Sequence, residues 1–399
     1  MKVVSVGDVS EQVRGVSYSK TESSEEPRPG FVAILRANNI TDEGLSFDDL
    51  VYVPVARVSP KQRIHANDVV IAASSGSLSV VGKAAQARQV MDGSFGAFCK
   101  VLRPNEDVDP LYFGHFFRTP AYRRIVSGLA AGANINNLRN EHLDDLQFSL
   151  PSLPEQKRIA AILDAADALR AKRRESIEQL ASLIQATFLE MFGDPVTNPK
   201  GWKTVPLGDH TLKVGSGSTP TGGDAAYKQE GIALIRSQNV HDGEFRLEGL
   251  AHIDDVQAAK LANVEVQADD VLLNITGASV ARVCRAPRHV LPARVNQHVC
   301  IIRAASTFDP TFVEQYLLAP SMKRRLLGIG ATGATRQAIT KAQVLMLDVF
   351  FAPIPLQQHF ASIVECIEQQ KTRLKAHLAE LDTLFVSLQS RAFNGELVA

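Results

Sequence analysis

The sequence predicts an α/β (α+β) protein with two tandem copies of one unit, each a mixed-sheet domain followed by a long helix. Three observations lead to this prediction: matches that recur at one offset, short apolar runs between Gly, Ser and Asn turns, and two long stretches without Gly or Pro. The expected order is a first domain over residues 1–153, a helical segment over 154–193, a second domain over 194–354 and a helical segment over 355–399.

The repeat appears at an offset of about 200 residues. Residues 32–42 align with residues 232–242, with four identities and four exchanges among Val, Ile and Leu. Collinear matches at one offset indicate a duplication. Further pairs at this offset are Gly7 and Gly208, Asp68 and Asp270, Cys99 and Cys300, Asp109 and Asp309, Pro154 and Pro355, and Phe192 and Phe393.

The domains are expected to combine strands with a helical stretch that follows an Asp-Pro pair. Apolar runs such as residues 69–71 and 271–273 predict strands. An Asp-Pro pair in each copy predicts a helix start with Pro at its first position. The predicted helices cover residues 111–125 and 311–327.

The stretches without Gly or Pro cover residues 155–192 and 356–394. A helix of about 38 residues would be about 57 Å long. Gly193 and Gly395 follow these stretches and are plausible helix ends.

Apolar residues in both stretches recur at alternating steps of three and four, and Leu169 is one of them. Arg173 and Gln370 interrupt this apolar seam, and both helices have an extra step of four at the same repeat position. A shared stutter in a coiled-coil pattern indicates that the helices pair with each other. Because the copies are equivalent, we expect an antiparallel pair with pseudo-two-fold symmetry. An ordinary bundle helix remains the alternative for either helix alone.

Composition restricts the class of protein. The chain has 399 residues, which indicates two or three domains, and its 45% apolar and 22% charged residues argue against disorder. The 43 Lys and Arg equal the 43 Asp and Glu, which excludes a histone-like polycation but not a DNA binder with a basic face. We expect a soluble, cytoplasmic protein without disulfide or zinc frameworks, since it has no signal-peptide pattern, no long apolar run and no CxxC.

Catalytic motifs are not recognisable. Residues 328–333 match GxGxxG as a string but follow a helix, and the first copy lacks the pattern. Residues 76–83 resemble a phosphate loop, but the spacing is one residue too long and Ala84 replaces the required Ser or Thr. We therefore predict that the chain is not an enzyme and holds neither a catalytic residue nor a metal.

Candidate DNA-contacting residues are basic and amide side chains that recur in both copies. Arg, Asn and Gln can read purine edges, and Lys and Arg clusters contact phosphates. For any single residue, a solvated helix face or a turn former is the alternative. The candidates are Arg36, Asn38, Asn39, Arg123, Arg124, Asn136, Asn137, Arg236, Gln238, Asn239, Lys323, Arg324, Arg336 and Gln337.

Several segments resemble the specificity subunits of type I restriction–modification systems. Residues 192–195 and 198–202 are similar to the junction after the first long helix of that family. Residues 154–156 resemble the opening of that helix, and residues 392–397 resemble the family's ending. The Gly-Ser-Thr-Pro of residues 217–220 is similar to the start of a recognition domain, and this adds Thr219 to the candidate DNA contacts.

The resemblance implies a non-catalytic subunit that reads double-stranded DNA. Each domain would be a target recognition domain for one half of a split, asymmetric sequence. The paired helices would set the number of unread base pairs and dock two methyltransferase subunits, which bind S-adenosylmethionine and methylate adenine. Restriction/translocase subunits would join for cleavage, and this chain would need no cofactor.

Two other readings of the residues stay open. One is a two-headed protein-binding adaptor on a coiled-coil stalk without DNA contact. The other is an enzyme whose motif is not recognised.

Overall fold

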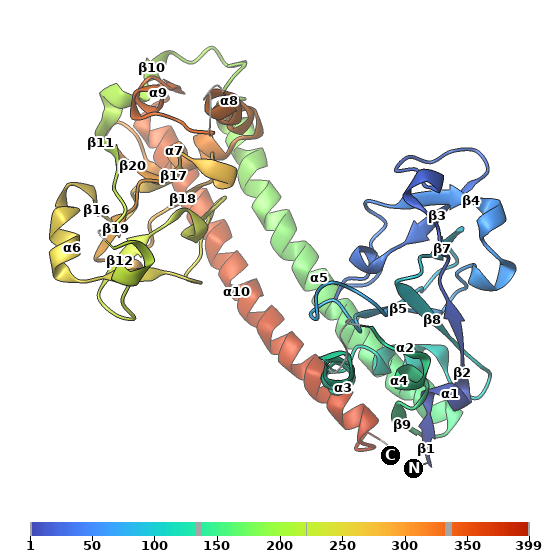
Figure 1. The fold of residues 1–399 in the computed structure, drawn as a ribbon. Helices are drawn as coiled ribbons and strands as arrows, with labels where there is room; N and C mark the ends of the chain where they lie inside the picture. Colours follow the sequence, from blue (N-terminus) through green and yellow to red (C-terminus); the bar gives the residue numbers. More distant parts are fainter. Residues whose placement is uncertain (1, 132–136, 221, 332–336, 398–399) are drawn as a thin grey trace. The chain divides into compact units, whose positions relative to one another are not determined.

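The computed structural model describes residues 2–131, 137–220, 222–331 and 337–397 (Figure 1). The chain divides into two compact units. Unit 1 comprises Met1–Arg174 and Ala376–Ala399, and unit 2 comprises Glu175–Lys375. Each unit therefore contains part of both long helices.

The described residues of unit 1 form three small sheets with the strand orders β1-β9, β2-β8-β5-β6 and β4-β3-β7. β3 pairs with β4 antiparallel and with β7 parallel, so this sheet is mixed, as predicted. The strands are β1 (Lys2–Ser5), β2 (Ser10–Arg14), β3 (Phe31–Leu35), β4 (Val51–Pro54), β5 (Val69–Ala72), β6 (Ala84–Gln86), β7 (Gly93–Phe95), β8 (Cys99–Pro104) and β9 (Gln147–Leu150).

The helices of unit 1 pack against these sheets, and α1 and α4 lie close to β1 and β9 in Figure 1. They are α1 (Val6–Val9), α2 (Pro110–Phe116), α3 (Pro120–Ala131), α4 (Asn140–Asp144), the first part of α5 (Leu153–Phe192) and the last part of α10 (Ile354–Phe393). Among the described helices, including these two of 40 residues, none has the apolar stretch needed to span a bilayer.

Unit 2 repeats the three sheets of unit 1, with one added edge strand in the mixed sheet and a further two-stranded sheet. Its sheets have the orders β10-β21, β11-β20-β17-β18, β15-β12-β19-β16 and β13-β14, and β12 pairs antiparallel with β15 and parallel with β19. Its strands are β10 (Thr204–Pro206), β11 (Thr211–Ser216), β12 (Ile232–Ile235), β13 (Val240–His241), β14 (Glu244–Phe245), β15 (Ala251–Ile253), β16 (Glu265–Val266), β17 (Val271–Asn274), β18 (Val283–Arg285), β19 (Ala293–Val295), β20 (Val299–Ala304) and β21 (Asp348–Phe350). Its helices are α6 (Asp255–Lys260), α7 (Pro310–Leu318), α8 (Pro320–Ala331), α9 (Lys341–Leu345) and the remaining parts of α5 and α10.

The single helix predicted after each Asp-Pro pair is wrong, because two helices occupy that stretch in each copy. α2 ends at Phe116 and α3 begins at Pro120, and the second copy breaks in the same way before Pro320. Proline has no N–H to continue a helix, and it disfavours helical geometry in the residue before it. The Asp-Pro start is confirmed, since the Asp109 carboxylate caps α2 and the Asp309 carboxylate caps α7.

Buried glutamines attach the long helices to these capped helices. Gln156 Oε1 accepts the Asp109 N–H at 2.7 Å, and its Nε2 donates to a loop carbonyl at 2.9 Å. Gln357 repeats both bonds, to the Asp309 N–H at 2.9 Å and to the Ala352 carbonyl at 2.8 Å. These buried amides explain why a glutamine lies two residues after the proline at the start of each long helix.

The predicted apolar seam is displaced by one residue at two positions. Leu169 is 56% exposed, whereas the neighbouring Arg170 is largely covered. Gln370 is exposed, whereas the neighbouring Lys371 is largely covered and its Nζ lies 2.6 Å from a Glu368 carboxylate oxygen. An α-helix drifts relative to a strict heptad pattern, so the buried face shifts beside a stutter.

A capped turn ends α5 at the junction segment. Gly193 has φ of +83°, a conformation that favours glycine, and its N–H donates to the Leu189 carbonyl at 2.9 Å. The Trp202 indole N–H donates to the Phe192 carbonyl at 2.8 Å. An Asp194 carboxylate oxygen accepts two backbone N–H groups at 2.9 and 3.0 Å. The junction motif is thus a helix-ending device.

We expect Gly193→Ala to destabilise unit 2 by more than Gly201→Ala does. Both glycines have a positive φ, which costs an L-residue about 1–2 kcal/mol. Only at Gly193 would an added Cβ also lie 2.9 Å from Pro199 Cγ, whereas nothing lies within 4 Å of one at Gly201. Urea unfolding of the full chain compares the two variants. Equal losses would show that the Pro199 contact contributes nothing.

Candidate nucleic-acid interface

Loops that follow β2, β3, β5 and β7 meet at one corner of unit 1. The Gly96 N–H donates to the Leu35 carbonyl at 2.9 Å, and the Val16 N–H donates to the Phe95 carbonyl at 2.7 Å. The Ala73 N–H donates to the Phe98 carbonyl at 2.9 Å. Residues 16–18, 36–38, 74–76 and 96–99 line a cavity of about 890 Å³, and we call this region the first corner.

Unit 2 brings the equivalent loops together through similar backbone hydrogen bonds. The Asn296 N–H donates to the Ile235 carbonyl at 3.1 Å, the Gly217 N–H to the Asn296 carbonyl at 3.0 Å and the Ile275 N–H to the His298 carbonyl at 2.9 Å. We call residues 217–219, 236–238, 275–277 and 296–299 the second corner.

A glycine at the same place in each corner permits this close approach. An added Cβ at Gly15 would lie 2.0 Å from the Gly96 carbonyl oxygen, and one at Gly217 would lie 1.9 Å from the Val295 carbonyl oxygen. The segment that starts at Gly15 is therefore the counterpart of the Gly-Ser-Thr-Pro segment. Thr219, a candidate contact, is exposed two residues after Gly217.

Asn39 and Asn239 hold their own loops together. Each is buried, and its Oδ1 accepts the N–H of the arginine three residues earlier, at 2.9 Å for Arg36 and 3.0 Å for Arg236. The Asn39 Nδ2 donates to the Asp48 carbonyl at 2.7 Å, and the Asn239 Nδ2 donates to backbone carbonyls as well. This arrangement favours the turn-former interpretation for both asparagines over base contact.

Arg36 and Asn38 share one partner. Arg36 Nη2 lies 2.9 Å from Asp49 Oδ2, and Asn38 Nδ2 lies 3.2 Å from the same oxygen. Both side chains nevertheless line the cavity, and Asn38 is exposed.

In the second corner a backbone carbonyl replaces that carboxylate. Arg236 Nη2 and Gln238 Nε2 donate to the Gly249 carbonyl at 2.7 and 2.9 Å. The Arg236 guanidinium lies 4.8 Å from the centre of the Tyr227 ring. Gln238 is exposed, so the two corners present different amides on similar loops.

In each basic pair, Arg123-Arg124 on α3 and Lys323-Arg324 on α8, the first residue bonds within the domain and the second is exposed. Arg123 donates to the backbone carbonyls of Ser79 and Val81, at 3.0 and 2.9 Å, and Lys323 forms an ion pair with Asp242. The second member of each pair, Arg124 and Arg324, is exposed. The exposed members suit phosphate contact better than their neighbours do.

The Gly-to-amide loops adjoin the corners at their described ends. Asn137 is exposed and forms a β-bridge with Ser74. Gln337 is also exposed, and its carbonyl accepts the Gly277 N–H at 3.1 Å. Asn136 and Arg336 lie outside the described residues.

The side chains at one pair of matched turns in the corners are not among the predicted contacts. Phe98 is 68% exposed at the turn between β7 and β8. Gln297 and His298 occupy the equivalent turn between β19 and β20. Only their matched turn positions could have indicated them, because exposure of an aromatic side chain is not readable from the sequence.

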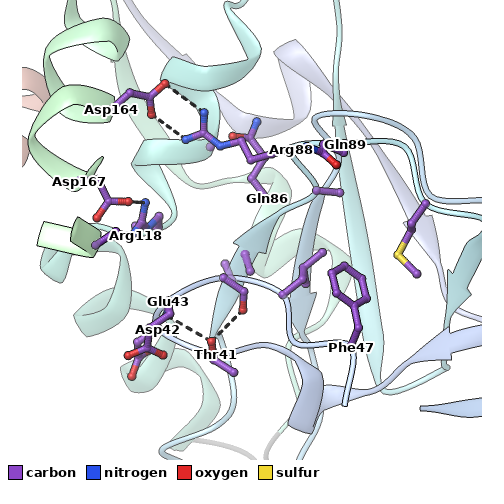
Figure 2. A pocket seen from close by; sticks show the side chains of 18 of the residues that line it. Thr41, Asp42, Glu43, Phe47, Gln86, Arg88, Gln89, Arg118, Asp164 and Asp167 are labelled. Atoms are coloured by element: carbon purple, nitrogen blue, oxygen red, sulfur yellow. Dashed lines mark hydrogen bonds and ion pairs between the residues drawn. The ribbon is translucent and has the colours of Figure 1, made fainter. Parts of the chain in front are cut away.

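Another cavity of unit 1, of about 570 Å³, lies between the 41–47 loop and α5 (Figure 2). Asp164 meets Arg88 with two contacts of 2.8 and 3.1 Å and the buried His115 Nε2 at 2.7 Å. Burial alone would raise the pKa of Asp164, but the hydrogen bonds from His115 and Arg88 hold this pKa well below its usual range. Arg118 Nη1 lies 2.7 Å from Asp167 Oδ2. The opposed charges anchor α5 to its domain.

The described residues contain no cluster of three or more His, Cys, Asp or Glu side chains that could hold a metal. Fold and site together define a duplicated α/β protein with two similar loop corners, one in each unit. These corners present polar and aromatic side chains in different combinations.

Comparisons with known proteins identify the family. Residues 1–179 match the model of the type I restriction modification DNA specificity domain. The chain is 30% identical over 417 residues to the StySPI specificity subunit of Salmonella potsdam, which covers 99% of this chain and 88% of the relative. It is 28% identical over 423 residues to the EcoKI specificity subunit of Escherichia coli, covering 100% and 89%. A chain from a solved structure of the type I R-M system has the same fold, with a TM-score of 0.58 at 18% identity over 99% and 98% of the two chains.

The chain belongs to the type I restriction enzyme specificity subunits. It is thus a non-catalytic member of a restriction–modification system.

Proposed function

We propose that this specificity subunit reads the two halves of a split, asymmetric DNA sequence. The target recognition domains would be residues 1–153 and 194–354. The observation that carries the proposal is the pair of corners, in which one backbone frame presents different side chains. Reading two different half-sites requires this combination of a constant frame and variable contacts.

The proposed contacts are the exposed members of the predicted set. Asn38, Gln238 and Thr219 would contact bases at the corners, with Asn137 and Gln337 beside them. Arg124 and Arg324 would contact phosphates, which fix register without reading sequence. Arg36 and Arg236 would position the loops. Asn136 and Arg336 are proposed as DNA contacts from the sequence pattern only. Asn39, Asn239, Arg123 and Lys323 would not contact DNA, because none of them is exposed and their polar groups bond within the protein.

Residues 154–193 and 355–399 would pair as an antiparallel coiled coil with pseudo-two-fold symmetry. Contacts inside unit 1 support this arrangement. Arg158 donates to the Leu397 carbonyl, and Arg170 Nε lies 2.6 Å from Asp382 Oδ1. Within unit 1, a residue further along α5 therefore contacts a residue earlier in the carboxy-terminal part of the chain, as in an antiparallel pair. The helix pair would set the unread gap, with domains that read one face of the duplex about 34 Å apart.

The helices would also dock two methyltransferase subunits, which bind S-adenosylmethionine, and restriction/translocase subunits would join that complex. Large apolar side chains exposed on the long helices support a partner surface. In unit 1 these are Leu169 on α5 and Leu384 and Val386 on α10. In unit 2, Leu183 on α5 is exposed in the same way. Burying such side chains against a partner is favourable.

The test is methylome sequencing of cells that express this chain together with a type I methyltransferase subunit with which it copurifies. We expect a split motif methylated on adenine, and its loss when this chain alone is deleted. A copurifying methyltransferase that modifies the same sites without this chain would reject the proposal. If the purified complex showed no binding to duplex DNA at any salt concentration, the adaptor without DNA contact would be favoured.

A further inference from the structure

We infer that the turns at residues 96–99 and 296–299 carry side chains that discriminate between bases. Phe98 would contact the 5-methyl group of a thymine in the first half-site. Gln297, which bonds to His298 in the free chain, would contact an adenine edge in the second half-site. The inference rests on the proposed DNA-reading function and names specificity residues within it.

The backbone of the first turn is fixed while its aromatic ring is free. The Cys99 N–H donates to the Gly96 carbonyl at 2.8 Å, which closes the turn. The Phe98 carbonyl accepts the N–H groups of Ala73 and Ser74 at 2.9 and 3.0 Å. The Phe98 side chain nonetheless remains 68% exposed. A rigid backbone that holds an aromatic ring in water positions that ring for a partner.

The surroundings of Phe98 suit a base edge rather than an apolar protein surface. Tyr18, Asn38 and Ser75 line the same cavity and offer hydroxyl and amide groups. The Arg36 guanidinium is already bonded to the Asp49 carboxylate, so little free charge faces the ring. In the major groove the thymine methyl is the apolar group that distinguishes a base pair, and phenylalanine is one of the side chains that contact it.

The second turn has a similar backbone and carries two polar side chains, Gln297 and His298. The Val299 N–H donates to the Asn296 carbonyl at 3.4 Å, as in the first turn. His298 is held from both sides, since its Nδ1 bonds to the Thr276 hydroxyl and its Nε2 lies 2.9 Å from Gln297 Nε2. The Gln297 carboxamide is therefore oriented by a histidine that is itself fixed.

One atom of this pair lacks a partner. Gln297 Oε1 is shielded from solvent and accepts no hydrogen bond from the described residues. An unsatisfied buried acceptor costs free energy. When the carboxamide rotates away from His298, Gln297 exchanges that single contact for the two hydrogen bonds that an amide side chain makes with adenine at N6 and N7. Binding of an adenine edge would thus satisfy an atom that is unpaired in the free chain.

The first experiment determines the methylated motif of complexes that contain Phe98→Ala or the double variant Gln297→Ala, His298→Ala. We expect Phe98→Ala to relax one thymine-containing position of one half-site, and the double variant to relax one position of the other half-site only. The loss of discrimination should be roughly tenfold at each position. Phe47→Ala is the matched control, because Phe47 is 56% exposed in unit 1 but lines the other cavity. It should leave the motif unchanged.

A second measurement isolates the methyl contact. Replacing the relevant thymine by uracil should weaken binding of the unmodified complex roughly tenfold, whereas the Phe98→Ala complex should bind both duplexes equally. Equal binding of thymine and uracil duplexes at every first-half position by the unmodified complex would overturn the role of Phe98, even if Phe98→Ala abolished methylation.

The outcomes separate this inference from the proposed function. An unchanged motif in both variants, with normal methylation, would overturn the inference and leave the DNA-reading function intact. A complex without any split motif even before substitution would overturn both.

Discussion

Phe385→Ala is expected to lower the free energy of unfolding of unit 1 by about 3–5 kcal/mol, the usual cost of removing a buried phenylalanine ring. Phe385 belongs to the carboxy-terminal part of α10 and is only 4% exposed within the core of unit 1. The guanidinium groups of Arg170 and Arg118 lie 4.4 and 5.6 Å from the centre of its ring. Truncation therefore removes apolar packing and two cation–π contacts together.

Leu384→Ala is the matched control for this prediction. Leu384 precedes Phe385 on the same helix but is 49% exposed, so its truncation should change stability by no more than about 0.5 kcal/mol. Hydrogen exchange of the chain without partners measures both variants, and protection should fall in unit 1 rather than unit 2. Equal effects of the two substitutions would contradict the packing of α10 into unit 1.

Asp68→Ala is expected to cost about 3–5 kcal/mol, because it breaks a buried ion pair and leaves a charge without its partner. Asp68 is fully buried, and its two carboxylate oxygens each lie 2.8 Å from a nitrogen of Arg103. The same carboxylate accepts the His65 N–H at 2.8 Å, which would also lose its partner. The second copy has this arrangement in Asp270 and Arg303, with contacts of 2.7 Å.

The repeat provides the comparison for this substitution. Asp68→Ala should reduce hydrogen-exchange protection in unit 1, and Asp270→Ala should reduce it in unit 2. Asp92→Ala removes the exposed partner of Arg63 in unit 1 and should leave stability within experimental error. If Asp68→Ala were as mild as Asp92→Ala, the buried pair would not hold the domain together.

These ion pairs and the buried glutamines Gln156 and Gln357 are the same in both copies, whereas the corner side chains differ. Asp68 and Asp270 keep one framework, while Phe98 in the first copy is replaced by His298 in the second. Such a division lets the reading surface change without loss of the fold. It is the physical basis on which the two domains can be proposed to read different half-sites.

Some predicted features depend on local signals and are present as expected. The helix start at Asp109-Pro110 and the glycine end at Gly193 each require only neighbouring residues, as does the continuous α5. The break before Pro120 was equally local, and the proline itself was the signal for it. The one-residue shift from Leu169 to Arg170 depends on what the helix packs against, so periodicity alone placed it wrongly.

The sequence by itself determined the duplication, the α/β class with two long helices, and the membership of a specificity-subunit family that its junction motifs resemble. The tertiary structure alone decided which loops meet at the corners, that Phe98 is exposed while Asn39 is buried, and that Phe385 packs in unit 1. The reason is physical. Caps, turns and helical periods arise between neighbours in the chain, whereas burial and the meeting of loops depend on contacts between distant residues, such as Phe385 with Arg118.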